Sequence, residues 1–122
     1  MPHTLDSEIW NYLESVTSRF ELVVLFGSHA RGQAYKSSDI DILLIDTQFD
    51  GWHYYTGVEN APVSFEWPPE YPALDIVCTC PDEFERRYAN DDQMVHRIAE
   101  DGFALNQDFA FVDFLRDIRR TN

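Results

Sequence analysis

The sequence predicts one domain of the α/β (α+β) class, with a small mixed β-sheet and helices packed on it. Three observations support this prediction. The chain of 122 residues suits a single domain, and 44% of its residues are hydrophobic, which is enough to build a core. Short continuous apolar runs rich in β-branched residues predict buried strands. Between these runs apolar residues recur at helical spacing, and interleaved strands and helices are typical of a sheet covered by helices.

The first part of the chain is predicted to form one helix and two strands. Apolar side chains recur three and four residues apart from about Leu5 to Ser18, with Thr4 or Asp6 as the N-cap. The runs Leu22–Phe26 and Ile40–Ile45 follow, and each is short, continuous and rich in β-forming residues. Such runs are typical of strands that are buried on both faces.

The C-terminal part is predicted to alternate in the same way. Leu74–Thr79 is a third apolar run, and Pro81 with two acids directly after it predicts the start of a helix. A second helix is expected from near Asp91 to Gly102, followed by a short edge strand at Phe103–Leu105. A last amphipathic helix is indicated by four apolar residues at helical spacing, namely Phe111, Phe114, Leu115 and Ile118.

The segment at about 47–73 departs from this pattern. It contains four prolines and seven aromatic residues. Long irregular insertions in small domains are usually functional or disordered, and the aromatic content argues against disorder. We therefore predict one domain over residues 1–122 with an aromatic, proline-rich insertion, and a hairpin through Trp52–Val58 and Val63–Trp67. Four of its aromatics could stack on a nucleobase, although we expect them to pack locally. These are Trp52, Tyr54, Tyr55 and Trp67.

The charge balance disfavours some partners. There are 22 acidic residues against 9 basic ones, the formal net charge is -13, and Lys36 is the only lysine. This charge repels nucleic-acid backbones, so we expect no binding to duplex nucleic acid. An anionic substrate would need a metal ion or a local basic group to approach. No apolar run reaches the length of a membrane span and the start of the chain lacks a signal peptide's features, so we expect a soluble cytoplasmic protein without a membrane partner.

Cys78 and Cys80 are the only cysteines, and they lie two residues apart on a predicted strand. Residues at this spacing share a face of the strand but are poorly placed to bond to each other. We expect both to be reduced, small, buried side chains, and the pair predicts neither a disulfide framework nor a metal cluster.

Gly27 and Ser28 end the first predicted strand, where a short helix is expected to begin. Glycine allows a tight turn and a close approach of a ligand to the backbone. The N–H groups at the start of a helix favour anions such as phosphate, and the Ser28 hydroxyl can add a donor. The alternative is an ordinary strand-to-helix turn, because this pair of residues is common at such turns.

Asp39 and Asp41 open the second predicted strand. Their spacing puts both carboxylates on one face, while Ile40 and Ile42 face the other way. Two adjacent carboxylates repel each other unless a cation lies between them. Oxygen ligands of this kind suit Mg²⁺, which binds one or two carboxylates and completes its shell with phosphate and water. The alternative is a solvated strand edge, which suits one aspartate better than two.

Asp75 lies inside the third apolar run, where a buried acid needs a partner or a metal. If the two acidic strands meet, three carboxylates share one site. Such a site could hold two metal ions about 3.5–4 Å apart for a displacement at phosphorus. The alternative for Asp75 is a turn or cap residue at the start of a strand.

The spacing of these residues resembles a known signature. Gly27-Ser28, ten residues and then Asp39-x-Asp41 is similar to the Gly-Ser-x10-Asp-x-Asp signature of the DNA polymerase β-like nucleotidyltransferase superfamily. More closely, Leu22–Ile45 resembles the minimal nucleotidyltransferases, the MNT proteins. Leu74–Leu105 is similar to their C-terminal half. His29 stands where many members carry arginine, and the aromatic insertion is longer than in the smallest members.

The resemblance implies a nucleotidyltransferase fold and a set of residue roles. It implies that Asp75 completes the metal site and takes the proton from the attacking hydroxyl. Arg31 either contacts phosphate or the turn, or forms a salt bridge with a nearby acid. The implied catalytic residues and ligands of two Mg²⁺ ions are Asp39, Asp41 and Asp75. The implied nucleotide-binding residues are Gly27, Ser28, Arg31 and Ser38.

The resemblance also implies an activity and a partner. Small MNT proteins transfer a nucleoside monophosphate, here expected to be AMP from ATP, onto a hydroxyl. Such proteins are often antitoxins that modify a tyrosine of a HEPN-domain toxin. Two alternatives are an aminoglycoside-type nucleotidyltransferase, which usually needs an added helical domain, and a non-catalytic antitoxin that binds its partner. The main alternative to an acceptor on a partner protein is haphazard self-modification of the chain at Tyr54, Tyr55 or Tyr71.

Overall fold

The computed structural model describes residues 3–105 and 108–121, and its centre is a five-stranded mixed sheet. The strands lie in the order β3-β4-β2-β1-β5, with β2 and β4 parallel and the other neighbours antiparallel. The strands are β1 (Leu22–Phe26), β2 (Ile40–Ile45), β3 (Trp52–Thr56), β4 (Leu74–Thr79) and β5 (Phe103–Ala104). The predicted α/β (α+β) class with a mixed sheet is confirmed, and it is consistent with the nucleotidyltransferase fold.

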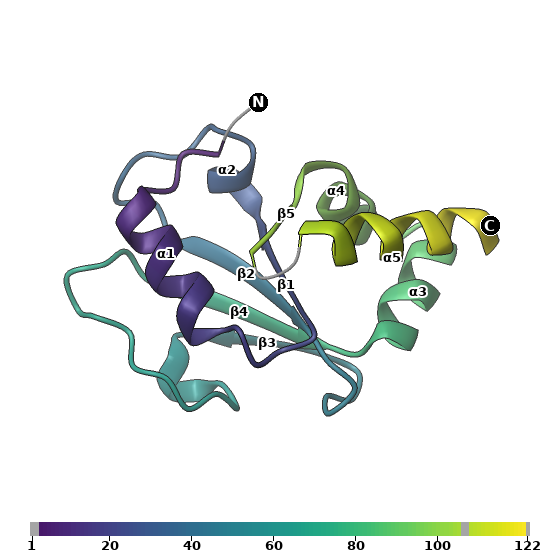
Figure 1. The fold of residues 1–122 in the computed structure, drawn as a ribbon, viewed down its shortest axis with the longest axis horizontal. Coiled ribbons are helices and arrows are strands. Elements are labelled where there is room, and N and C mark those ends of the chain that lie inside the picture. The colour runs from purple at the N-terminus through teal and green to yellow at the C-terminus, as the bar shows by residue number, and fades with distance from the viewer. Residues whose placement is uncertain (1–2, 106–107, 122) are drawn as a thin grey trace.

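Helices cover both faces of this sheet (Figure 1). One face carries α1 and the irregular segment that follows β3, and the other carries the three C-terminal helices. The helices are α1 (Ser7–Val16), α2 (Gly27–Ala30), α3 (Pro81–Ala89), α4 (Gln93–Asp101) and α5 (Asp108–Thr121), with a short 3-10 helix η1 (Val58–Asn60). Within the described residues, no helix is long and apolar enough to cross a membrane.

Alternation along the strands divides the core into two clusters. Ile42 of β2 belongs to the cluster under α1, whereas Leu43, the next residue, belongs to the cluster under α3, α4 and α5. Both side chains are fully buried, so the continuous apolar run of β2 is explained by burial on both faces. The cluster under the C-terminal helices matters for the site, since it lines the same face as the acidic side chains described below.

Local capping explains where the helices begin. The Asp6 side chain accepts a hydrogen bond from the Glu8 N–H (2.8 Å), so Asp6 rather than Thr4 caps α1. Pro81 is the first residue of α3, as its fixed φ and missing N–H favour. Asp92 caps α4 by accepting from the Val95 N–H (3.1 Å), and Gly102 ends this helix. The strand-and-helix order predicted from the sequence is confirmed outside the 47–73 segment.

The predicted hairpin between Trp52–Val58 and Val63–Trp67 is wrong. Residues 52–56 do form a strand, but this strand pairs antiparallel with β4, with Tyr54 opposite Val77. Residues 63–67 form no strand, because prolines before and after them cannot donate to a ladder. This part packs instead through its aromatic rings, and the Trp67 indole N–H donates to the Pro72 carbonyl oxygen (2.8 Å).

The two cysteines are free thiols. Cys78 is buried on β4, and burial raises the pKa of its thiol to about 12, whereas Cys80 is half-buried at the start of α3. We expect the Cys78→Ala/Cys80→Ala double variant to keep its activity and to lose about 1 kcal/mol of stability from reduced packing. Thermal melting and a transfer assay check this. A loss of activity at unchanged melting temperature would instead indicate a chemical role for a thiol.

Candidate active site

The strand register brings the acidic residues into one row across the sheet. Asp41 of β2 lies opposite Phe26 of β1 on one side and opposite Asp75 of β4 on the other. Thr56 of β3 pairs with Asp75 and completes the row. Asp39 lies two residues before Asp41, so its side chain is expected on the same face. The structure thus brings together the two strands that the sequence analysis expected to meet.

This acid row lies where the helical cover of the sheet ends. Leu43 and Val77, two residues along from Asp41 and Asp75, are buried under the C-terminal helices. Asp41 and Asp75 themselves are only half-buried, and Asp39 is exposed. The carboxylates therefore sit between a dry apolar core on one side and solvent on the other, where a substrate can reach them.

The carboxylates perturb one another. Burial is the main cause that raises the pKa of Asp41 to about 6, and the charges of Asp75 and Asp39 raise it further, while Arg31 lowers it. The pKa of Asp75 is also raised, by burial and by Asp39, while the neighbouring Tyr54 hydroxyl lowers it. Two half-buried acids whose ionisation is disfavoured, with the charge of Asp39 beside them, form a site that a cation would stabilise.

The donor set fits a hard divalent cation that also binds substrate. Among the residues that the structure describes, no group of three or more acidic, histidine or cysteine side chains is arranged to hold a metal ion. Mg²⁺ does not require such a closed set, because it commonly takes one or two carboxylates and completes its shell with phosphate oxygens and water. The metal-binding role of Asp39, Asp41 and Asp75 stays a prediction that this geometry permits.

Gly27 lies directly against Asp41, and two separate features of the turn require a residue without a side chain there. Its φ is +76°, in the left-handed region that other residues adopt at a cost. A Cβ on Gly27 would lie 2.3 Å from the Asp41 Oδ2 atom, which is a collision. The glycine therefore lets the backbone of the β1–α2 turn lie directly beside a carboxylate. Ser28 is the next residue, and it is half-buried.

His29 has a structural role that the sequence analysis missed. Its side chain is only 2% exposed, so it does not face a ligand as an arginine at this position is expected to do. Its Nε2 donates to the Ser38 carbonyl oxygen (2.9 Å), which leaves Nδ1 to accept from the Thr4 hydroxyl (3.0 Å). The imidazole thus ties the β1–α2 turn to the residue directly before Asp39. The sequence alone does not indicate this contact, because His29 and Ser38 are nine residues apart.

Replacing His29 with alanine is expected to loosen this connection. The variant would leave the Ser38 carbonyl group and the Thr4 hydroxyl without this partner, at a cost of about 1–3 kcal/mol. Transfer activity should fall because Asp39 is no longer held in place. His53→Ala is the matched control, since His53 is exposed on β3. Equal melting temperatures and equal activities for the two variants would contradict the positioning role.

Two further predicted nucleotide-binding residues have partners within the protein. The Ser38 hydroxyl oxygen accepts a hydrogen bond from the Tyr35 N–H (2.9 Å), and the Ser38 N–H donates to the Tyr35 carbonyl oxygen (3.0 Å). Ser38 thus closes the loop that precedes Asp39. The Arg31 Nε donates to the Gln33 Oε1 (3.3 Å). Within the described residues, no ion pair of 4.0 Å or less involves Arg31. The salt bridge that was the alternative role of Arg31 is therefore not observed among those residues.

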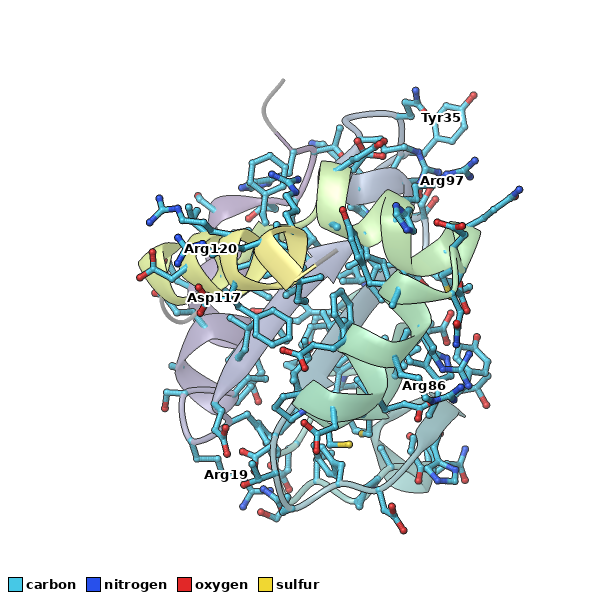
Figure 2. The ribbon with its side chains drawn as sticks, turned by 90° about the vertical axis from the view of Figure 1, so that its right-hand side faces the viewer. Arg19, Tyr35, Arg86, Arg97, Asp117 and Arg120 are labelled. Carbon is cyan, nitrogen blue, oxygen red and sulfur yellow. The ribbon has the colours of Figure 1, made fainter. Side chains whose placement is uncertain are left out.

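A cavity of about 350 Å³ adjoins the Gly27 turn. It lies between the end of β1, the start of α2 and helix α4, and it offers both apolar surface and two guanidinium groups. Arg97, on the α4 side in Figure 2, is the basic residue that sequence reasoning missed, because nothing in the local sequence connects α4 with the turn. The lining residues are Phe26, Gly27, Arg31, Gln93, Met94, Arg97, Ile98 and Asp101.

The raised pKa of Asp41 predicts a pH-dependent stability. Because this pKa is about 6 in the metal-free folded protein and 3.8 for an aspartate without such surroundings, the folded state holds the proton more tightly. The resulting stabilisation is present below about pH 4 and is lost as the pH rises through about 6. Urea unfolding without Mg²⁺ should show this loss in the unmodified chain and a flatter profile in Asp41→Asn. Parallel profiles for the two proteins would contradict the assignment.

Comparison with known proteins gives a family match over the N-terminal part of the chain. A family model described as "Polymerase beta, Nucleotidyltransferase" matches residues 7–61, a range that includes the Gly27 turn, Asp39 and Asp41. Asp75 lies outside the matched range, so its place in the site rests on the pairing of β4 with β2. No curated protein gives a significant match to the chain. The match makes this part of the chain similar to nucleotidyltransferases of the polymerase β type, and it suggests nucleotidyl transfer as the general class of reaction.

Proposed function

We propose that this protein transfers a nucleoside monophosphate, AMP from ATP in the simplest case, onto a hydroxyl group with the aid of Mg²⁺. The observation that carries the proposal is the acid row of Asp39, Asp41 and Asp75 at the open edge of the helical cover, directly beside the Gly27 turn. Adjacent carboxylates are suited to hold a metal ion, and the glycine backbone beside them leaves room for a phosphate bound to that metal.

The surroundings of the row support a nucleoside triphosphate as donor. Arg31 and Arg97 line the cavity beside Gly27, and they supply positive charge in a chain whose formal net charge is -13. Guanidinium groups bind phosphate oxygens with two parallel hydrogen bonds. Phe26, Met94 and Ile98 give the same cavity an apolar wall that suits a nucleoside. We assign the triphosphate to the Gly27 and Arg31 side and the nucleoside to this wall.

The reaction is a displacement at the α-phosphorus. The acceptor oxygen forms a bond to this phosphorus, the bond to the bridging oxygen of the β-phosphate breaks, and pyrophosphate leaves. Asp75 lies beside Asp41 in the row, and we assign it to accept the proton of the hydroxyl. When bound, Mg²⁺ supplies charge stabilisation to the transferring phosphate and orients it.

We further propose that the acceptor is a tyrosine on a basic partner protein, a HEPN-domain toxin, which would make this chain an antitoxin. The support is electrostatic. The acid row is open to solvent, so an acceptor carried by another protein can reach it. The charge of -13 favours rapid capture of a positively charged partner, and this capture should weaken as salt is added.

Mass spectrometry of a HEPN-type partner after reaction with ATP and Mg²⁺ tests this function. We expect one added AMP on a partner tyrosine, no adduct with Asp41→Asn, and an unchanged amount with Asp50→Asn, which alters an exposed aspartate between β2 and β3. Tight binding of the partner without any adduct would favour a non-catalytic binding module. An adduct on an aminoglycoside but on no protein would favour the small-molecule alternative.

A further inference from the structure

Tyr54 is positioned against the acid row by the strand pairing. Thr56 of β3 lies opposite Asp75, and Tyr54 lies two residues before Thr56 on the same face. Diagonal neighbours of this kind are about 7–8 Å apart along the backbone, which is within reach of an aromatic side chain. Tyr54 and Asp75 thus lie on one face of the sheet, on neighbouring strands. The phenol is therefore within reach of the carboxylate that we assign as proton acceptor.

Tyr54 lies on the edge strand opposite Val77, the β4 residue that the C-terminal helices cover. Trp52, two residues earlier on the same face of β3, has the Arg87 guanidinium over its ring at 4.8 Å from the centroid. Trp52 also packs against the core under α3, α4 and α5. Tyr54 is 58% exposed. A substrate bound at the acid row can thus reach the Tyr54 hydroxyl without any rearrangement of the helices.

The strand order puts this hydroxyl on the side of the row away from the Gly27 turn. Along the strand order, the sheet presents Tyr54 on β3, Asp75 on β4 and Asp41 on β2, with Gly27 at the start of α2 directly after β1. In a displacement at phosphorus, the attacking oxygen and the leaving oxygen lie roughly in line on opposite sides. A triphosphate held at Gly27 would place its leaving pyrophosphate on one side and the Tyr54 hydroxyl on the other.

We propose that Tyr54 is a nucleotide acceptor, so that the enzyme attaches a nucleoside monophosphate to its own β3 strand. This inference rests on the function proposed above. The phenol oxygen of Tyr54 forms a bond to the α-phosphorus, the bond from that phosphorus to the oxygen bridging to the β-phosphate breaks, and pyrophosphate leaves. The phenol proton passes to the Asp75 carboxylate. The product is a tyrosine phosphodiester at the open edge of the site.

The other tyrosines of this region are placed differently. Tyr55 faces the opposite side of the sheet and packs against the core under α1. The Tyr71 hydroxyl donates to the Glu8 carboxylate on α1 (3.1 Å), and its ring contacts Tyr12. Tyr35 is the contrasting case, because it is 82% exposed and projects from the molecule in Figure 2. If exposure alone decided modification, Tyr35 would be favoured over Tyr54.

Peptide mapping of the full chain after incubation with ATP and Mg²⁺, with no partner present, tests the proposal. We expect one nucleoside monophosphate on Tyr54, no adduct in Tyr54→Phe, and an undiminished adduct in the matched control Tyr35→Phe. A second readout needs neither metal nor turnover. An adenosine sulfonyl fluoride, whose reactive group stands where the phosphates of the nucleotide would lie, should label Tyr54, and ATP should protect it.

The possible results separate this inference from the proposed function. An adduct on Tyr35, Tyr55 or Tyr71 with Tyr54 unmodified would overturn the inference. It would also be overturned if the chain stays unmodified while added N-acetyltyrosinamide receives the nucleotide, and in that case the proposed function survives. If neither the chain, nor this small phenol, nor a HEPN-type partner is modified, the proposed function and the inference fail together.

Discussion

Asp41→Asn is expected to abolish nucleotide transfer while leaving the metal-free domain as stable as the unmodified one or more so. Asp41 is half-buried beside Asp75 and near Asp39, and each raises its pKa. Removing one charge relieves this repulsion and the cost of burying it. Activity should fall by more than about 100-fold, because even the outer-shell partners of metal ligands typically contribute about 10–100-fold. Asp39→Asn should behave in the same way.

Thermal melting with and without Mg²⁺ and ATP checks both halves of this prediction. The ligands should raise the melting temperature of the unmodified protein and raise that of Asp41→Asn less, because only ligands that bind the folded state stabilise it. The exposed Asp50→Asn variant is the control for a lost charge. Full residual transfer in both the Asp39 and the Asp41 variants would remove the basis for the metal-site assignment.

Gly27→Ala is expected to have an effect of similar size for a steric reason. The new Cβ would collide with the Asp41 carboxylate oxygen at 2.3 Å, so this side chain or the turn must move. A displacement of about 1 Å at a catalytic group can reduce the rate about 100-fold. The left-handed φ of +76° adds about 1–2 kcal/mol of backbone strain.

Gly51→Ala separates these two effects. Gly51 has nearly the same φ, +71°, but the nearest atom to its added Cβ is the His53 Nε2 at 3.4 Å. Both alanine variants should lose about 1–2 kcal/mol of stability, and only Gly27→Ala should lose transfer activity. Equal activities in the two variants would show that the closeness of Gly27 to Asp41 has no bearing on catalysis.

The parts of the fold that local physics determines could be predicted from the sequence. Leu22–Phe26, Ile40–Ile45 and Leu74–Thr79 are strands with the predicted bounds, because continuous apolar runs are buried on both faces of a central sheet. The pairing of Asp39 with Asp41 on one face follows from the period of a strand. That Asp75 would join them required β4 to lie beside β2, which the sequence analysis expected and the parallel register provides.

Features that depend on contacts between distant parts of the chain could not be predicted from the local sequence. The partner of β3 is β4 rather than residues 63–67, and this choice is made by the sheet as a whole. Tyr54 was expected to pack locally, but this pairing places it beside Asp75. Arg97 reaches the site only because α4 lies next to the Gly27 turn. His29 was treated as a departure from the MNT pattern, and its burial was not visible in the local sequence.

Comparison of α-labelled with γ-labelled ATP tests the central claim most directly. In nucleotidyl transfer, the α-phosphate stays on the acceptor and the β- and γ-phosphates leave together. With Mg²⁺ and a HEPN-type partner, we predict covalent label on protein from α-labelled ATP, none from γ-labelled ATP, and none from either with Asp41→Asn. Protein labelled from γ-labelled ATP would show phosphoryl transfer instead. No label from either nucleotide, although the partner binds, would contradict an enzymatic role for the acid row.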